Sequence, residues 1–212
     1  MQAKEFIQLL TERNIHVFTI SDAAKILRCP QSYAKLFLYR AAQKKLIGRV
    51  VRGIYFVAAK ANEYEIASYV LPHSYISLVS ALYYYGLTTQ IPNKVYVVST
   101  FRHPSIKNIA GFDIIFRNTN EKMMYGYHKE ADGNISIADP EKAIVDIFYF
   151  KEVNDLDELA LSKPSRVDID RLIVYAKRSG RASVIARTAG LLRENGYVSQ
   201  AKALLISGQV RR

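Results

Sequence analysis

Acidic side chains and lysines in the middle of the chain are the residues whose types could support catalysis. A nuclease that uses a divalent metal needs two or three carboxylates that converge beside a lysine. The candidates are Asp113, Glu121, Lys122, Asp139, Glu141, Lys142 and Asp146. We interpret Asp139 as a helix N-cap, Glu141 as a first-turn acid that favours the helix dipole, and Asp113 as isolated on its strand. The pattern therefore predicts no enzyme, and a metal-dependent nuclease is the less favoured alternative.

Histidine and cysteine do not form the common metal or nucleophile motifs. The 4 histidines and the single cysteine, Cys29, lack the spacing of a zinc site. The chain contains no phosphate-binding glycine loop and no Gly-x-Ser-x-Gly elbow. We therefore expect no catalytic residues, no metal and no cofactor. One cysteine also excludes an internal disulfide and is typical of the reducing cytoplasm, which is the predicted location.

Positive charge is concentrated at the two ends of the chain. The 212 residues carry 30 Lys+Arg and 19 Asp+Glu, a formal charge of +11. Residues 1–60 hold 11 Lys/Arg against 3 Asp/Glu, residues 61–160 hold 8 against 13, and residues 161–212 hold 11 against 3. No apolar run has the length of a membrane span, so we expect no membrane partner. The charge instead indicates a polyanionic partner.

The first sixty residues have the element order of a winged helix-turn-helix. An amphipathic helix over Gln2–Arg13 precedes an extended segment, Val17–Ile20. We expect Ser21 to cap a short helix that stops before Pro30, and Ser32 to cap a basic helix that runs to about Lys45. Residues 46–57 then read as two strands that meet at Arg52-Gly53. A basic hairpin directly after a basic second helix is typical of a wing that follows a recognition helix.

The helical wheel separates the two faces of the basic helix. At 100° per residue, Ala34, Phe37, Leu38 and Ala41 share one arc, and polar residues occupy the opposite one. An ordinary amphipathic surface helix has the same pattern, and the following hairpin is what favours DNA. The predicted DNA-binding residues are Gln31, Ser32, Tyr33, Lys35, Tyr39, Arg40, Lys44, Arg49 and Arg52.

The remaining chain alternates helices and strands and ends in a basic helical tail. We expect helices over 62–71 and 77–85, strands over 94–99 and 112–117, and a hairpin from Tyr125 to Ile137 that turns at Asp132-Gly133. Asp139-Pro140 starts a further helix, and residues 168–178, 181–195 and 199–207 read as three more. The fold class is therefore α+β: a winged helix-turn-helix (1–60), a mixed α/β domain (61–160) and a basic helical tail (161–212). The tail packs on or extends the second domain, clamps DNA, or binds a partner.

Four short stretches resemble the AbiEi family of type IV toxin–antitoxin antitoxins and related transcriptional regulators. They are Ile47–Tyr55, Ser77–Thr88, Pro92–Val98 and Asp139–Asp146, in the order expected for that family. The resemblance covers roughly residues 5–150. The resemblance rests on the order of these stretches, because each alone is a structural motif such as a wing glycine or a helix cap.

The resemblance implies a protein that represses its own operon. Family members bind inverted repeats upstream of that operon, and their C-terminal region counters a nucleotidyltransferase-type toxin, usually without a stable complex. Two copies, as monomers or a homodimer, would then occupy double-stranded operator DNA. The residues carried over are Gln31, Ser32, Lys35, Tyr39 and Arg40 for the major groove, with Arg49 and Arg52 on the backbone or minor groove. A stand-alone winged-helix regulator without a toxin partner is the alternative.

Overall fold

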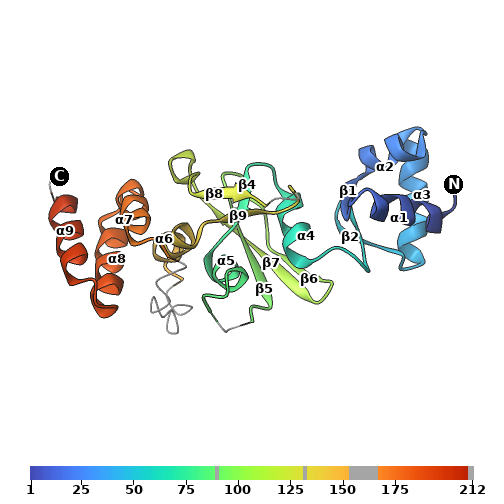
Figure 1. Cartoon of the computed structure of the whole chain (residues 1–212). Helices are drawn as coiled ribbons and strands as arrows, with labels where there is room; N and C mark the ends of the chain where they lie inside the picture. The colour runs from blue at the N-terminus through green and yellow to red at the C-terminus, as the bar shows by residue number, and fades with distance from the viewer. Residues whose placement is uncertain (89–90, 131–132, 153–166, 210–212) are drawn as a thin grey trace.

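The computed structural model describes residues 1–88, 91–130, 133–152 and 167–209. Figure 1 shows three parts in a row: an N-terminal module of helices with a small sheet, a larger sheet, and a group of helices at the C-terminal end. The α+β class expected from the sequence is confirmed. None of the helices in these ranges is long and apolar enough to cross a bilayer.

The N-terminal module follows the predicted order of elements. It consists of α1 (Ala3–Glu12), β1 (Val17–Thr19), α2 (Ile20–Leu27), α3 (Gln31–Gln43), β2 (Ile47–Val51) and β3 (Ile54–Val57). Its three strands form an antiparallel sheet in the order β1-β3-β2. Phe6 of α1, Phe18 of β1 and Leu38 of α3 are completely buried in the core that the three helices share with this sheet.

Two predicted helix caps in this module are wrong. Ser21 lies inside α2, because Thr19 caps the helix two residues earlier: its hydroxyl accepts from the Asp22 N–H (3.2 Å), and the Asp22 carboxylate accepts from the Thr19 N–H (2.9 Å). This reciprocal pair satisfies two donors at once, which a serine at position 21 cannot do. Ser32 lies within the first turn of α3, since Pro30 occupies the N-cap position.

The central part is a mixed six-stranded sheet. It contains β4 (Ser74–Ile76), β5 (Lys94–Ser99), β6 (Ile106–Ile109), β7 (Phe112–Asn118), β8 (Tyr127–Lys129) and β9 (Ser136–Ala138), in the order β6-β7-β5-β4-β9-β8. Strands β5 and β7 are parallel, as are β4 and β9. The predicted hairpin is confirmed as the antiparallel pair of β8 and β9. Of its predicted turn, Asp132 lies outside the described residues.

Strands β4 and β6 were not predicted from the sequence. Strand β4 has only three residues, and all three are buried, so it shows no alternation of polar and apolar side chains. In β6, the apolar residues Ile106 and Ile109 flank the polar pair Lys107-Asn108, and the strand pairs irregularly with β7. Neither segment therefore carries the period of two by which strands are recognised.

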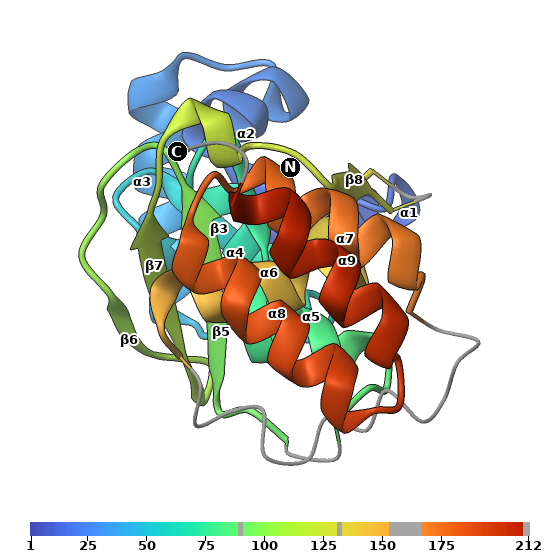
Figure 2. The ribbon, with the colours of Figure 1, turned by 90° about the vertical axis from the view of Figure 1, so that its left-hand side faces the viewer.

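Helices cover the sheet and link it to both ends of the molecule. Helix α4 (Glu63–Val70) lies between the sheet and the N-terminal module, and α5 (Leu78–Tyr84) packs beside α6 (Pro140–Phe150). A short 3-10 turn, η1 (Glu121–Met123), precedes β8. Helices α7 (Ile169–Arg178) and α8 (Ala182–Glu194) pack against α6, and α9 (Val198–Gln209) packs on α8 at the end of the molecule (Figures 1 and 2). Leu172, Val184 and Leu204 belong to the same core as the sheet residue Val97.

The N-terminal module makes polar contacts with α4. The His16 imidazole Nδ1 lies 2.9 Å from the Glu65 carboxylate, and the Tyr69 hydroxyl donates to the Asp22 carboxylate (3.2 Å). Phe56 of β3 is buried in the core that also contains the six-stranded sheet. Helix α3 therefore belongs to a module that α4 connects to the rest of the chain.

Candidate nucleic-acid interface

One face of helix α3 packs into the core of the N-terminal module, and the opposite face is exposed to solvent. Ala34, Leu38 and Ala41 are buried, and Phe37 packs partly against them, as the helical wheel predicted. The seven α3 and C-cap residues predicted to bind DNA are all exposed. Leu36 is exposed as well, although leucine is a residue type that is usually buried. The exposed set is Gln31, Ser32, Tyr33, Lys35, Leu36, Tyr39, Arg40, Gln43 and Lys44.

The wing is a short hairpin anchored beside the start of α2. Its turn is Arg52-Gly53, where Gly53 has φ +89°, a conformation that glycine adopts without strain. The Gly53 carbonyl accepts from the Ile20 N–H (3.1 Å) and so holds the tip of the hairpin in place. Arg49 and Arg52 are exposed, and the Arg49 Nε donates to the Val51 carbonyl (3.3 Å). Both predicted wing cations are therefore available at the surface.

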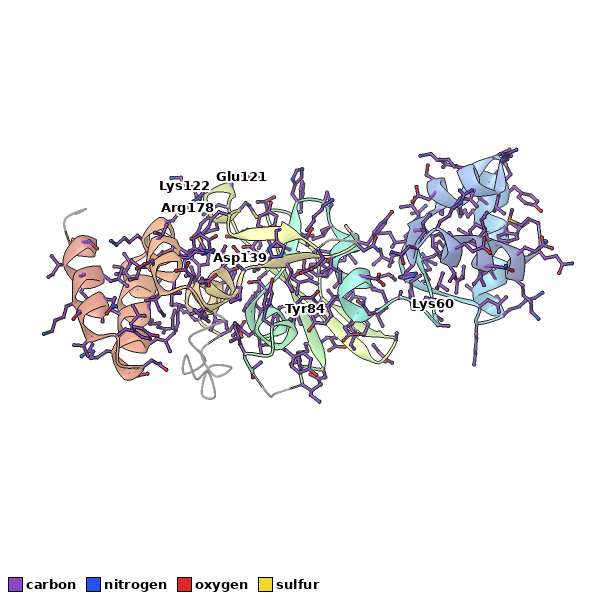
Figure 3. All side chains as sticks on the ribbon, viewed as in Figure 1. Lys60, Tyr84, Glu121, Lys122, Asp139 and Arg178 are labelled. Carbon is purple, nitrogen blue, oxygen red and sulfur yellow. The ribbon has the colours of Figure 1, made fainter. Side chains whose placement is uncertain are left out.

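The positive charge of the N-terminal module lies mostly in residues 23–62. This stretch contains no Asp or Glu, and its cations are Lys25, Arg28, Lys35, Arg40, Lys44, Lys45, Arg49, Arg52 and Lys60. None of the ion pairs in the described ranges involves a cation of α3 or of the wing. Lys60 lies in the segment that leads from this module to the rest of the chain (Figure 3). Uncompensated charge on a helix and an adjoining hairpin suits a polyanion.

A cavity of about 390 Å³ lies beside α3 and extends this cationic surface. It is lined by Lys4 of α1 together with Arg40 and Lys44, while Phe37 and Leu46 supply an apolar floor. Cations from α1 and α3 thus gather at one margin of the exposed face. A DNA backbone phosphate is a ligand whose charge matches this margin.

Four of the acids considered for metal catalysis are engaged in structural contacts: Asp113, Asp139, Glu141 and Asp146. Asp139 occupies the N-cap position of α6, as predicted, but its side chain caps no backbone N–H: its carboxylate accepts from the Tyr175 hydroxyl (2.9 Å) and contacts the His128 Nδ1 (3.0 Å). Figure 3 shows Asp139 between the sheet and the C-terminal helices. Asp113 is the one acid of β7, as predicted, and it pairs with Lys107 of the neighbouring strand β6 (2.8 Å). No group of three or more His, Cys, Asp or Glu that could hold a metal occurs among the described residues.

Lys142 and Asp146 form an ion pair that is completely buried. The Asp146 carboxylate also accepts from the Ser77 hydroxyl (2.7 Å) and the Tyr75 hydroxyl (3.1 Å). Burial lowers the pKa of Lys142, although the neighbouring Asp146 opposes that shift. Burial and the Asp146 charge together raise the pKa of Tyr75. With no solvent access and every oxygen of Asp146 engaged, this group joins α6 to the sheet instead of facing a substrate.

Several cations of the C-terminal helices are bound within the molecule. The Arg178 guanidinium lies 4.3 Å from the Tyr125 ring centre, and that of Arg181 lies 3.6 Å from the Tyr149 ring centre. Arg178 is seen near the top of α7 in Figure 3. Arg171 faces the Glu141 carboxylate at 3.8 Å. Part of the tail's positive charge therefore serves to dock α7 and α8 on the central part.

Glu141 gives the contact between α6 and α7 a dependence on pH. Its carboxylate is buried and accepts from the Asp168 N–H (2.6 Å), and burial raises its pKa above 4.5. Because the folded state then binds the proton more tightly than the unfolded state, ionised Glu141 opposes folding as the pH rises above 4.5. We expect Glu141→Gln to raise the melting temperature relative to the wild type more at pH 7.5 than at pH 4.5, measured by thermal unfolding. An equal shift at both values would contradict this account.

Comparison with known proteins identifies the fold and no family. No family model matches the chain, and no curated protein does either. The chain is similar to a solved structure, described as the crystal structure of RV2827C protein from Mycobacterium tuberculosis, with a TM-score of 0.62 and 17% sequence identity. The alignment covers 96% of this chain and 80% of that one. The likeness therefore extends over the N-terminal module, the sheet and the C-terminal helices.

Proposed function

We propose that this protein is a DNA-binding transcriptional repressor of its own operon. The observation that carries the proposal is the exposed face of α3, whose cations have no ion-pair partner within the described residues and which leads directly into a hairpin with Arg49 and Arg52. A helix of 13 residues is about 20 Å long, which suits insertion into a major groove. The role we assign is binding without catalysis, in the cytoplasm.

We propose further that the protein is the antitoxin of a type IV toxin–antitoxin system. This part rests on the resemblance of Ile47–Tyr55, Ser77–Thr88, Pro92–Val98 and Asp139–Asp146 to the AbiEi family. The toxin would be of nucleotidyltransferase type, and no stable complex with it is needed. Without such a toxin, the same N-terminal surface supports a stand-alone regulator.

The two parts of the proposal are tested separately. For repression, a reporter driven by the DNA upstream of the protein's own gene should be silenced by the wild type and released by Lys35→Glu/Arg40→Glu. For antitoxin activity, co-expression with a nucleotidyltransferase encoded beside this gene should restore growth. The Lys35→Glu/Arg40→Glu variant should also restore growth when expressed from a foreign promoter. Silencing of the reporter without rescue of growth would contradict the antitoxin role and favour a stand-alone regulator.

A further inference from the structure

Two large side chains, Leu36 and Tyr39, lie in the middle of the exposed face of α3, with the polar Ser32 and Gln43 before and after them along the helix. Leu36 is 46% exposed, although leucine is ordinarily buried, and Tyr39 is 60% exposed. They are three residues apart and therefore neighbours on one side of the helix. At 100° per residue they lie nearly opposite the buried Ala34, Leu38 and Ala41. We call Leu36 and Tyr39 the central strip of α3.

Cations border the central strip on both sides. On the helical wheel, Lys35 lies on one side of the strip, and Arg40 and Lys44 lie on the other. All three are exposed. Duplex DNA has the complementary arrangement, because phosphates line the two walls of the major groove and base edges form its floor. The strip is thus placed where base edges would lie when the flanking cations contact phosphates.

We propose that the central strip reads the 5-methyl groups of thymines in the major groove, with Leu36 as the specificity-determining residue. This inference rests on the proposed DNA-binding function. A leucine side chain forms no hydrogen bond with a base edge, and the thymine methyl is the apolar group that base edges display in the major groove. Tyr39 adds its ring to the same contact. Each half-site of the operator therefore contains one or two thymines opposite α3.

The test removes the methyl group and nothing else. A duplex is selected from a random pool with the full-length protein, and each of its thymines is then replaced in turn by deoxyuridine, which pairs with adenine in the same way. At one or two positions in each half-site, affinity should fall about fourfold, the change that corresponds to burying one methyl-sized group. At the other thymines, affinity should be unchanged.

Variants separate this contact from general effects on binding. Leu36→Ala should bind the selected duplex more weakly and should no longer distinguish thymine from uracil. Leu205→Ala, a matched change of an exposed leucine in α9, should keep the wild-type discrimination. Because Leu36 is not part of a core, its replacement is expected to leave the melting temperature unchanged.

Three results would overturn the inference, and they differ in what else they affect. Equal wild-type affinity for thymine and all-uracil duplexes, with scrambled DNA still rejected, would overturn the thymine reading and leave DNA binding intact. A change in oligomeric state on Leu36→Ala, with discrimination retained, would identify the strip as a contact between protein chains. Absence of any sequence preference in the wild type would overturn this inference together with the proposed function.

Discussion

Reversing the charge of Lys35 and Arg40 together is expected to weaken binding to operator DNA at least a hundredfold. Both side chains are exposed on α3, and neither takes part in an ion pair within the described ranges, so their charge is free to meet phosphate or base edges. A hydrogen bond to a charged group contributes about 1.5–3 kcal/mol, and two lost contacts therefore exceed two decades in affinity. Fluorescence anisotropy with the upstream DNA measures the change.

The matched control reverses two exposed cations of the C-terminal helices. Lys177 of α7 and Arg187 of α8 are exposed as Lys35 and Arg40 are, and their reversal changes the net charge by the same amount. We expect Lys177→Glu/Arg187→Glu to retain operator affinity within about threefold, the difference expected from long-range charge alone. Equal losses in both double variants would mean that DNA binding depends on total charge or that the tail clamps DNA.

Removing the Asp146 carboxylate is expected to cause the largest loss of stability. Asp146→Ala leaves the Lys142 ammonium buried without its partner, and breaking a buried pair in this way costs about 3–5 kcal/mol of the free energy of unfolding. It also leaves the Ser77 hydroxyl without its acceptor and the Tyr75 hydroxyl with only the more distant Met123 carbonyl (3.5 Å). Urea unfolding monitored by circular dichroism measures the loss.

The double variant Lys142→Met/Asp146→Leu separates loss of the charge pair from loss of packing. Both charges are removed and the side-chain volume is kept, so most of the stability lost in Asp146→Ala should return. Lys142→Met alone should cost less than Asp146→Ala, because Asp146 keeps two hydroxyl donors. A cost below about 1 kcal/mol for Asp146→Ala would show that Lys142 is not held as a buried charge.

The sequence predicts the elements of the N-terminal module because each has a local signal. The apolar positions Ala34, Leu38 and Ala41 recur with the helical period, and Arg52-Gly53 marks the hairpin turn; both are found as expected. The predicted cap at Ser21 is wrong because Thr19 and Ser21 both carry a hydroxyl that could cap a helix. Only the pairing of Thr19 with Asp22 selects where the helix begins.

The contacts made by single side chains were less predictable. Leu36 was not among the residues predicted to bind DNA, because leucine is usually buried and its type gives no reason to expect it on an exposed face. Asp139 has the residue type of a cap, yet its carboxylate contacts Tyr175, which is 36 residues away in the chain. Lys142 and Asp146 have the four-residue spacing of a surface ion pair, and only the packing of α6 on the sheet shows that they are buried. Such contacts depend on the tertiary structure and cannot be predicted from local sequence patterns.

The salt dependence of binding to the upstream DNA tests the central claim most directly. If the α3 and wing surface contacts about six phosphates, the logarithm of the association constant should fall with the logarithm of salt concentration with a slope near −5. In Lys35→Glu/Arg40→Glu the slope should be shallower by about 2, because two of those contacts are lost. Both slopes are expected for the full-length protein. A wild-type affinity that does not change with salt, or a slope that the double variant leaves unaltered, would contradict it.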